Sequence, residues 1–294
     1  MLALIGTVPE AECGLVEGEA AREPGEIRVG SHGFPVSRGT PALIAACLAA
    51  GEVLHTAAPV VFLGGDVGRG TGSRLVYRRL VDLLPQGGFT ILTFHYLQPD
   101  VDWHNRILLT LEGLSPRPIL IADAGFMYAA KMSGEAPQYD LFTPDAGELA
   151  FLADEEAPHP FYTRGFILHE EQKVPELIDR AFRHGNAARC LLVKGPVDTV
   201  ACAGRIVETV DSPSIEALEP IGGTGDTLTG IVAALVHAGW PVEKAAGIAA
   251  RANRIAGALA DPSPRTPVAA LIDQIPRALR RLLDSGASLH DIEP

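Results

Sequence analysis

The chain has 294 residues, of which 47% are hydrophobic and 20% charged, and its formal net charge is −12. These proportions indicate a globular protein with a sizeable core and exclude a disordered chain. The acidic balance argues against a general nucleic-acid-binding protein, which usually has a basic surface. No apolar run approaches the roughly 20 residues that span a bilayer, and no secretion signal is evident at the start. We therefore expect a cytoplasmic protein that binds neither nucleic acid nor membrane.

Apolar strands and helices alternate along most of the chain. The first part is difficult to interpret: 2–5 and 26–29 resemble short strands, and a segment rich in Gly and Glu separates them. The helices that we expect beyond it are 40–54, 72–84, 106–113, one from about 148, 174–184, 226–238, 242–260 and 267–283. The expected strands are 60–63, 89–94, 118–122, 139–143 and 190–194, followed by a hairpin of 199–202 and 205–209.

This alternation predicts an α/β fold with a mostly parallel central sheet and helices on both faces. In such sheets ligands bind beyond the carboxyl ends of the strands. The loops there that are rich in glycine or acidic residues are 64–68, 123–125, 144–148 and 194–196. The sequence therefore predicts a binding site at this edge. We interpret 1–294 as a single domain, because no repeat, low-complexity tract or long linker interrupts it; the role of 1–29 stays open.

The segment 221–230 reads Ile-Gly-Gly-Thr-Gly-Asp-Thr-Leu-Thr-Gly and leads directly into an apolar helical pattern. Glycines let the backbone approach a ligand closely, and the unpaired amides at the start of a helix attract anions such as phosphate. Asp226 would repel a phosphate unless it has a chemical role. We predict that it takes a proton from a hydroxyl that attacks a phosphoryl group. The alternative is a tight turn in which Asp226 only caps the helix.

Other strand ends supply charged candidates. Lys194, followed by Gly195, ends a buried strand and is placed to reach a nucleotide phosphate, although a surface lysine has the same pattern. Asp145 and Glu148 can bind Mg²⁺ through water or orient a substrate hydroxyl. Capping of the helix that begins there explains the same two carboxylates equally well. Asp123, which follows the strand 118–122, can likewise either serve the site or only cap the segment that begins there.

Cysteine and histidine spacing predicts no metal site. We expect reduced thiols at Cys13, Cys47, Cys190 and Cys202. Cys190 and Cys202 can face each other across the hairpin, but a disulfide between them is the less favoured interpretation. His95 and His104 lie in a polar stretch that contains aromatic residues and is either structural or substrate-facing.

Together these motifs resemble the ribokinase-like superfamily, and within it the ADP- or ATP-dependent NAD(P)H-hydrate dehydratases. That family carries Gly-Gly-Thr-Gly-Asp-Val-Leu-x-Gly where residues 222–230 read Gly-Gly-Thr-Gly-Asp-Thr-Leu-Thr-Gly. Less specific matches are 64–68, 123–125, 143–148, 194–195, 199–201 and the tail 271–279. Asp145 departs from the pattern, because the dehydratases usually have His there.

The resemblance implies a three-layer ribokinase-like sandwich, a homo-oligomer, and a lyase that repairs hydrated NADH or NADPH with ADP or ATP and Mg²⁺. The nucleotide would phosphorylate the ring hydroxyl with Asp226 as base, and loss of phosphate would restore the cofactor. The resemblance assigns the nucleotide and its phosphates to Lys194, Gly195, Thr199, Gly222, Gly223, Thr224 and Gly225. It assigns the hydrated substrate to Thr40, Gly68, Asp123, Asp145 and Glu148. With Asp145 in place of His, two alternatives remain: a kinase of a small vitamin, alcohol or sugar, and a nucleotide-binding domain without catalysis.

Overall fold

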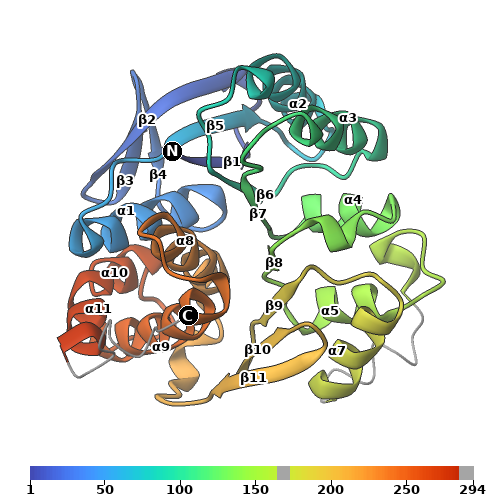
Figure 1. Ribbon diagram of the computed structural model, residues 1–294. Coiled ribbons are helices and arrows are strands. Elements are labelled where there is room, and N and C mark those ends of the chain that lie inside the picture. The colour runs from blue at the N-terminus through green and yellow to red at the C-terminus, as the bar shows by residue number, and fades with distance from the viewer. Residues whose placement is uncertain (164–172, 285–294) are drawn as a thin grey trace.

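The structure is a computed structural model that describes residues 1–163 and 173–284, and its strands form one eleven-stranded sheet (Figure 1). Along the sheet the strands follow the order β11-β10-β9-β8-β7-β6-β1-β5-β2-β3-β4. Their bounds are β1 Leu2–Val8, β2 Leu15–Glu23, β3 Glu26–Val29, β4 His32–Pro35, β5 Val60–Gly65, β6 Ile91–His95, β7 Ile119–Ala122, β8 Leu141–Phe142, β9 Cys190–Val193, β10 Asp198–Cys202 and β11 Arg205–Val210.

The middle of the sheet, from β9 to β5 in this order, is parallel throughout. Ile5 of the central strand lies between Phe62 of β5 and Phe94 of β6. The outer strands are antiparallel: β2 pairs with β5 at one border, and β10 pairs with β9 at the other. The predicted α/β fold with a mostly parallel central sheet is therefore confirmed. All strands of the described residues belong to this continuous sheet, and on that basis we propose a single domain.

Helices cover both faces of the sheet (Figure 1). The α-helices are α1 Thr40–Leu54, α2 Thr71–Leu83, α3 Val101–Glu112, α4 Phe126–Met132, α5 Ala146–Ala153, α7 Val174–Arg183, α8 Thr224–His237, α9 Val242–Leu259, α10 Val268–Ile272 and α11 Ile275–Asp284. Short 3₁₀ turns are η1 Ala11–Cys13, η2 Leu84–Gln86, η3 Ala136–Gln138, η4 Pro160–Tyr162 and η5 Glu216–Leu218. In the part of the chain that the structure describes, no helix is both long and apolar enough to cross a membrane.

Two hydrophobic cores lie on opposite faces of the sheet. Successive side chains of β1 point to alternate faces, so Leu2 and Leu4 belong to the core that contains α1, α8 and α9. Ala3 and Ile5 belong to the other core, together with apolar residues of α2, α3, α5 and α7. A strand buried on both faces must be apolar throughout, which explains the short continuous apolar runs in the sequence.

Several sequence-based expectations about the elements are wrong, and β4 and α4 are among the elements that were not predicted. The strand β2 was not predicted, because only Val16 and Ala20 of its nine residues are buried and the apolar signal is weak. The single helix expected at 267–283 is divided into α10 and α11. Pro276 has no N–H to bond to the carbonyl of Ile272, so a continuous helix would lack that hydrogen bond. By contrast, the helix predicted at 40–54 is confirmed with its bounds.

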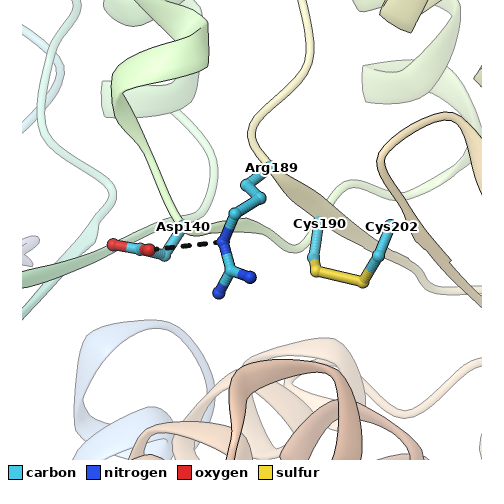
Figure 2. The surroundings of a disulfide bond; sticks show 4 residues. All are labelled: Asp140, Arg189, Cys190 and Cys202. Carbon is cyan, nitrogen blue, oxygen red and sulfur yellow. Dashed lines mark ion pairs between the residues drawn. A yellow bond between two sulfur atoms is a disulfide. The ribbon is translucent and has the colours of Figure 1, made fainter.

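The expectation of four reduced thiols is also wrong. Cys190 of β9 and Cys202 of β10 form a disulfide, with Cα atoms 4.2 Å apart (Figure 2). The antiparallel register places these two residues directly opposite each other. Figure 2 also shows the neighbouring Arg189, whose Nε lies 3.5 Å from Oδ1 of Asp140 in an ion pair.

Candidate functional site

A cavity of about 600 Å³ opens at the carboxyl edge of the parallel strands. Residues from several segments far apart in the sequence form its wall. The predicted site residues among them are Asp123, Asp145, Glu148, Lys194, Gly195, Gly223, Thr224, Gly225 and Asp226. The cavity therefore brings together most of the residues that the motifs had singled out.

The glycine-rich loop closes into the start of α8, whose N-cap is Gly223. Gly223 has a φ of 100°, a conformation that favours glycine, and a Cβ there would lie 3.1 Å from Cα of Arg38. Asn253 of α9 fixes the first turn, because its Nδ2 donates to the carbonyl of Thr224 at 3.0 Å and its Oδ1 accepts from Thr227 Oγ1 at 2.7 Å. The first amides of α8 have no acceptor in a preceding turn, so this wall of the cavity is suited to an anion.

Asp226 lies in the first turn of α8 and is 7% exposed. Its Oδ2 accepts from the Gly39 amide at 2.6 Å, and its Oδ1 lies 3.0 Å from Nε2 of His95. Burial alone would raise the pKa of Asp226. The hydrogen bonds from His95 and the Gly39 amide, together with the charge of Lys194, hold that pKa below its usual value. Asp226 is therefore an anion at neutral pH and is able to accept a proton.

Thr40 lies behind His95 and is not among the residues that line the cavity. It is 1% exposed, and its Oγ1 is 3.0 Å from Nδ1 of His95. Thr40 was predicted to face the substrate, whereas the structure connects it to Asp226 through a buried imidazole. The signal for His95 in the sequence was its position at the end of an apolar strand, directly at the carboxyl edge.

Lys194 and Asp123 form a buried ion pair at the base of the cavity. The Lys194 ammonium lies 2.9 Å and 3.0 Å from the two carboxylate oxygens of Asp123. Thr229 of α8 donates to Oδ2 of Asp123 at 2.8 Å. Burial alone would lower the pKa of Lys194, but the charges of Asp123 and Glu148 raise it above its usual value. Lys194 is therefore a permanent cation beside the glycine-rich loop.

Asp145 and Glu148 form a capping box at the start of α5. The Glu148 amide donates to Oδ1 of Asp145, and the Asp145 amide donates to Oε2 of Glu148, both at 2.8 Å. Both side chains also line the cavity, so the capping interpretation and the site interpretation are compatible. Burial, together with the charges of Asp123 and Asp145, raises the pKa of Glu148 to about 7, although Lys194 opposes this change.

Besides Thr40, three predicted residues lie outside the wall of this cavity: Gly68, Thr199 and Gly222. Gly68 lines a separate hollow of about 190 Å³ beside α2. In its loop, Oδ1 of Asp66 accepts from the amides of residues 68–70, and Oδ2 accepts from the amide and hydroxyl of Ser73. Asp66 therefore has a structural reason to stand in that loop. Thr199 is buried in β10, and Gly222 adjoins Arg38.

Arg254 of α9 was not identified from the sequence, and it holds two loops at the cavity. Its Nε lies 2.7 Å from Oδ2 of Asp198, and its Nη2 donates to the carbonyls of Gly195 and Pro196 at 2.8 and 2.9 Å. Its Nη1 donates to the carbonyls of Asp211 and Pro213. A single arginine inside a helical pattern carries no sequence signal for this role.

Tyr96 belongs to the stretch around His95 that the sequence left as either structural or substrate-facing. It follows β6 with a φ of 51°, which is uncommon for a residue other than glycine, and it is 47% exposed in the cavity wall. Its ring centroid lies 4.1 Å from that of His95. Tyr96 therefore covers the buried imidazole and offers an aromatic surface to the cavity.

The fold is shared with known proteins. No protein-family model matches the chain. The ADP/ATP-dependent NAD(P)H-hydrate dehydratase of Bacillus subtilis, co-crystallized with ATP/Mg²⁺, has a TM-score of 0.57 at 16% identity, covering 96% of this chain and 90% of that one. A ribokinase-like superfamily protein of Enterococcus faecalis V583 has a TM-score of 0.54 at 15% identity, covering 95% and 86%. These likenesses define a ribokinase-like fold.

Relatives in sequence define the family more closely. The chain is 38% identical over 224 residues to the uncharacterized protein MJ1337 of Methanocaldococcus jannaschii, which covers 76% of this chain and 92% of that protein. It is also 39% identical over 110 residues to a bifunctional NAD(P)H-hydrate repair enzyme Nnr of Hyperthermus butylicus, covering 37% of this chain and 19% of that enzyme. The chain has a ribokinase-like fold and belongs to the family of the Methanocaldococcus protein.

Proposed function

We propose that this protein is an ADP- or ATP-dependent dehydratase that repairs hydrated NADH or NADPH. The observation that carries the proposal is the position of Asp226. An ionised carboxylate and the first amides of α8 face one cavity, so a base and an anion-binding wall lie side by side. This pairing is what transfer of a phosphoryl group to a hydroxyl requires.

In the proposed reaction Asp226 removes the proton from the ring hydroxyl of the hydrated cofactor. The hydroxyl oxygen forms a bond to the terminal phosphorus of the nucleotide, and the bond from that phosphorus to its bridging oxygen breaks. The carbon–oxygen bond of the phosphorylated ring then breaks, phosphate leaves with the electron pair, and a proton is lost from the neighbouring ring carbon. The ring double bond of NADH or NADPH is thereby restored.

The loop 223–225 and Lys194 would stabilise the transferring group. Fixed amides and a permanent cation act on developing negative charge without reorganisation. Lys194 is already bound to Asp123, so its position is set before any ligand arrives. Gly195 and Thr199 would contribute to the nucleotide side through the segment that Arg254 holds.

The acidic cavity would accept Mg²⁺ together with the nucleotide. Among residues 1–163 and 173–284, no cluster of three or more His, Cys, Asp or Glu side chains could hold a metal ion unaided. Mg²⁺ normally keeps several waters and uses one or two carboxylates plus substrate phosphates. Asp145 and Glu148 are suited to that arrangement. The pKa of Glu148 is raised by burial and by the negative charges of Asp123 and Asp145, and a cation would offset those charges. Bound Mg²⁺ would neutralise phosphate charge during transfer.

The substrate assignment is supported by relatives. The repair enzyme of Hyperthermus and the dehydratase of Bacillus both carry NAD(P)H-hydrate in their names. The predicted substrate residues Asp123, Asp145 and Glu148 line the same cavity of about 600 Å³ as Asp226. By the same resemblance we propose a homo-oligomer.

The test is incubation of the protein with ADP or ATP, Mg²⁺ and hydrated NADH. Return of the NADH absorbance with release of phosphate is the expected result. Asp226→Asn should abolish this turnover while the thermal unfolding curve stays that of a folded protein. Substantial activity of Asp226→Asn would remove Asp226 from the role of base.

Asp145 supports a second candidate function, a kinase of a small alcohol, vitamin or sugar. The dehydratases usually have His at this position, and here a carboxylate that also caps α5 lines the cavity. A kinase would leave a stable phosphomonoester instead of a dehydrated product. Incubation with nucleotide, Mg²⁺ and a panel of alcohols distinguishes the two by ³¹P NMR.

A further inference from the structure

His95 is buried between Asp226 and Thr40. The imidazole is 1% exposed, and each ring nitrogen has a partner at 3.0 Å: Nε2 lies beside Oδ1 of Asp226, and Nδ1 lies beside Oγ1 of Thr40. Tyr96 covers the ring on the side of the cavity. His95 therefore contacts the proposed base but not the open cavity.

The partners determine which nitrogen carries the proton. An ionised carboxylate only accepts hydrogen bonds, so Nε2 must donate to Asp226. In the neutral ring Nδ1 is then an acceptor, and the Thr40 hydroxyl is its donor. The other charged groups near the ring are Asp123, whose Oδ2 lies 3.9 Å from Nε2, and Lys194, which is bound to Asp123.

Two fixed donors define the orientation of the Asp226 carboxylate. His95 holds Oδ1, and the amide of Gly39, at the start of α1, holds Oδ2. A carboxylate has about four lone-pair sites, so these two bonds leave sites that can receive a substrate proton from the cavity. Gly39 directly precedes α1 and His95 ends β6, so two separate elements hold the carboxylate.

We propose that His95 is a positioning residue that holds the Asp226 carboxylate in its reactive orientation, with Thr40 fixing the imidazole tautomer. The proposal rests on the proposed role of Asp226 as base. It assigns to Thr40 a structural task behind the site in place of contact with substrate. No proton leaves the active site through His95 in this arrangement, since Nε2 stays protonated throughout.

The activity test compares two variants with a matched control. His95→Phe keeps the ring volume and removes the donor, whereas His95→Gln places an amide donor near the position of Nε2. The expected result for His95→Phe is a fall in kcat of about 10- to 100-fold, because a displaced base loses its alignment, with KM changed less than about twofold. His95→Gln should recover most of the loss. His104→Phe replaces another buried histidine, away from this cavity, and should keep kcat within about twofold of the wild type.

A second readout does not depend on turnover. The carboxyl carbon of Asp226, identified by its absence in Asp226→Asn, is titrated by ¹³C NMR in the wild type and in His95→Phe. Loss of one hydrogen bond to the anion should raise the pKa of Asp226, and the acid limb of the kcat/KM profile should move by the same amount.

The outcomes distinguish the two proposals. An unchanged Asp226 titration in folded His95→Phe overturns the positioning role, as does a kcat equal to that of the control. A shifted titration in a protein that turns over none of the tested hydroxyl substrates supports the contact and overturns the proposed function alone. A shifted titration with reduced kcat and rescue by His95→Gln supports both.

Discussion

The ammonium of Lys194 lies within hydrogen-bond distance of both carboxylate oxygens of Asp123, at 2.9 and 3.0 Å. Asp123 is 1% exposed, so its charge has little access to water. The predicted nucleotide lysine is therefore already part of a buried ion pair. A phosphate that approaches Lys194 would bind its ammonium alongside Asp123 and would not displace the Asp123 carboxylate.

Removal of Lys194 should cost both stability and nucleotide affinity. Lys194→Met leaves the Asp123 carboxylate buried without a cation, and breaking a buried pair in this way costs about 3–5 kcal/mol. Urea denaturation should show that loss, and calorimetry should show weaker binding of ATP. The double variant Lys194→Met/Asp123→Asn should recover much of the stability but not the affinity. Equal stability of Lys194→Met and the wild type would contradict this explanation.

Residues at strand ends were predictable, because a parallel sheet brings its carboxyl ends to one edge whatever the loops between them. Asp123, Lys194 and Asp145 were found in this way, and Asp226 was found from the glycine pattern. Arg254 could not be found, since it reaches the cavity from the middle of α9 and only the packing of that helix decides where its guanidinium lies. The same limit applies to Thr40, whose position behind His95 depends on how α1 meets β6.

Arg254→Met should loosen two loops at once. The guanidinium holds the carbonyls of Gly195, Pro196, Asp211 and Pro213 as well as the Asp198 carboxylate. Amide hydrogen exchange within 195–198 and 211–214 should become faster, and ATP should bind about 10-fold more weakly because the loops must be ordered on binding. Arg254→Lys should not restore protection, since an ammonium cannot reproduce the planar set of donors. If amide hydrogen exchange in these loops is the same in Arg254→Met as in the wild type, Arg254 does not hold them.

Two variants of Tyr96 can distinguish the effect of its strained backbone conformation from the effect of its proposed contact with substrate. Its φ of 51° is tolerated by Asn but poorly by β-branched residues. Tyr96→Asn should therefore be as stable as the wild type or slightly more stable, whereas Tyr96→Val should lose about 1–3 kcal/mol. Both variants should raise KM for the hydrated substrate, because both remove the aromatic surface over His95. The measurements are thermal unfolding and steady-state kinetics, and a KM unaffected in both variants would exclude Tyr96 from substrate binding.

The disulfide should stabilise the β9–β10 pair. Cys190 and Cys202 are 12 residues apart, and closing a loop of that size is worth about 3 kcal/mol in the chain-entropy description. Cys202→Ser should lower the free energy of unfolding by about that amount, and a reducing agent should lower the wild type similarly without affecting the variant. Cys13→Ser is the control, since Cys13 is a free thiol. Insensitivity of the wild type to reduction would show that the two thiols are not paired.

Acid should destabilise the protein through His104. This histidine is fully buried, with Nε2 2.9 Å from the hydroxyl of Tyr139 and Nδ1 3.1 Å from Oγ of Ser133. Burial lowers the pKa of His104 from 6.5 to about 4, so the ring stays neutral in the folded protein while the unfolded chain takes up a proton below pH 6.5. Its contribution to stability is complete above that pH and is lost as the pH falls toward 4. Between pH 7 and pH 5 the loss amounts to about 2 kcal/mol.

His104→Gln removes this titration and keeps an amide near Tyr139. Wild type and variant are compared by urea denaturation at pH 7, 6 and 5, because other groups titrate equally in both and cancel in the difference. The variant should lose less stability than the wild type on going to pH 5, by about 2 kcal/mol. Parallel pH profiles of the two proteins would mean that His104 is already protonated in the fold, and the ring would then need a carboxylate partner in place of the hydroxyls of Tyr139 and Ser133.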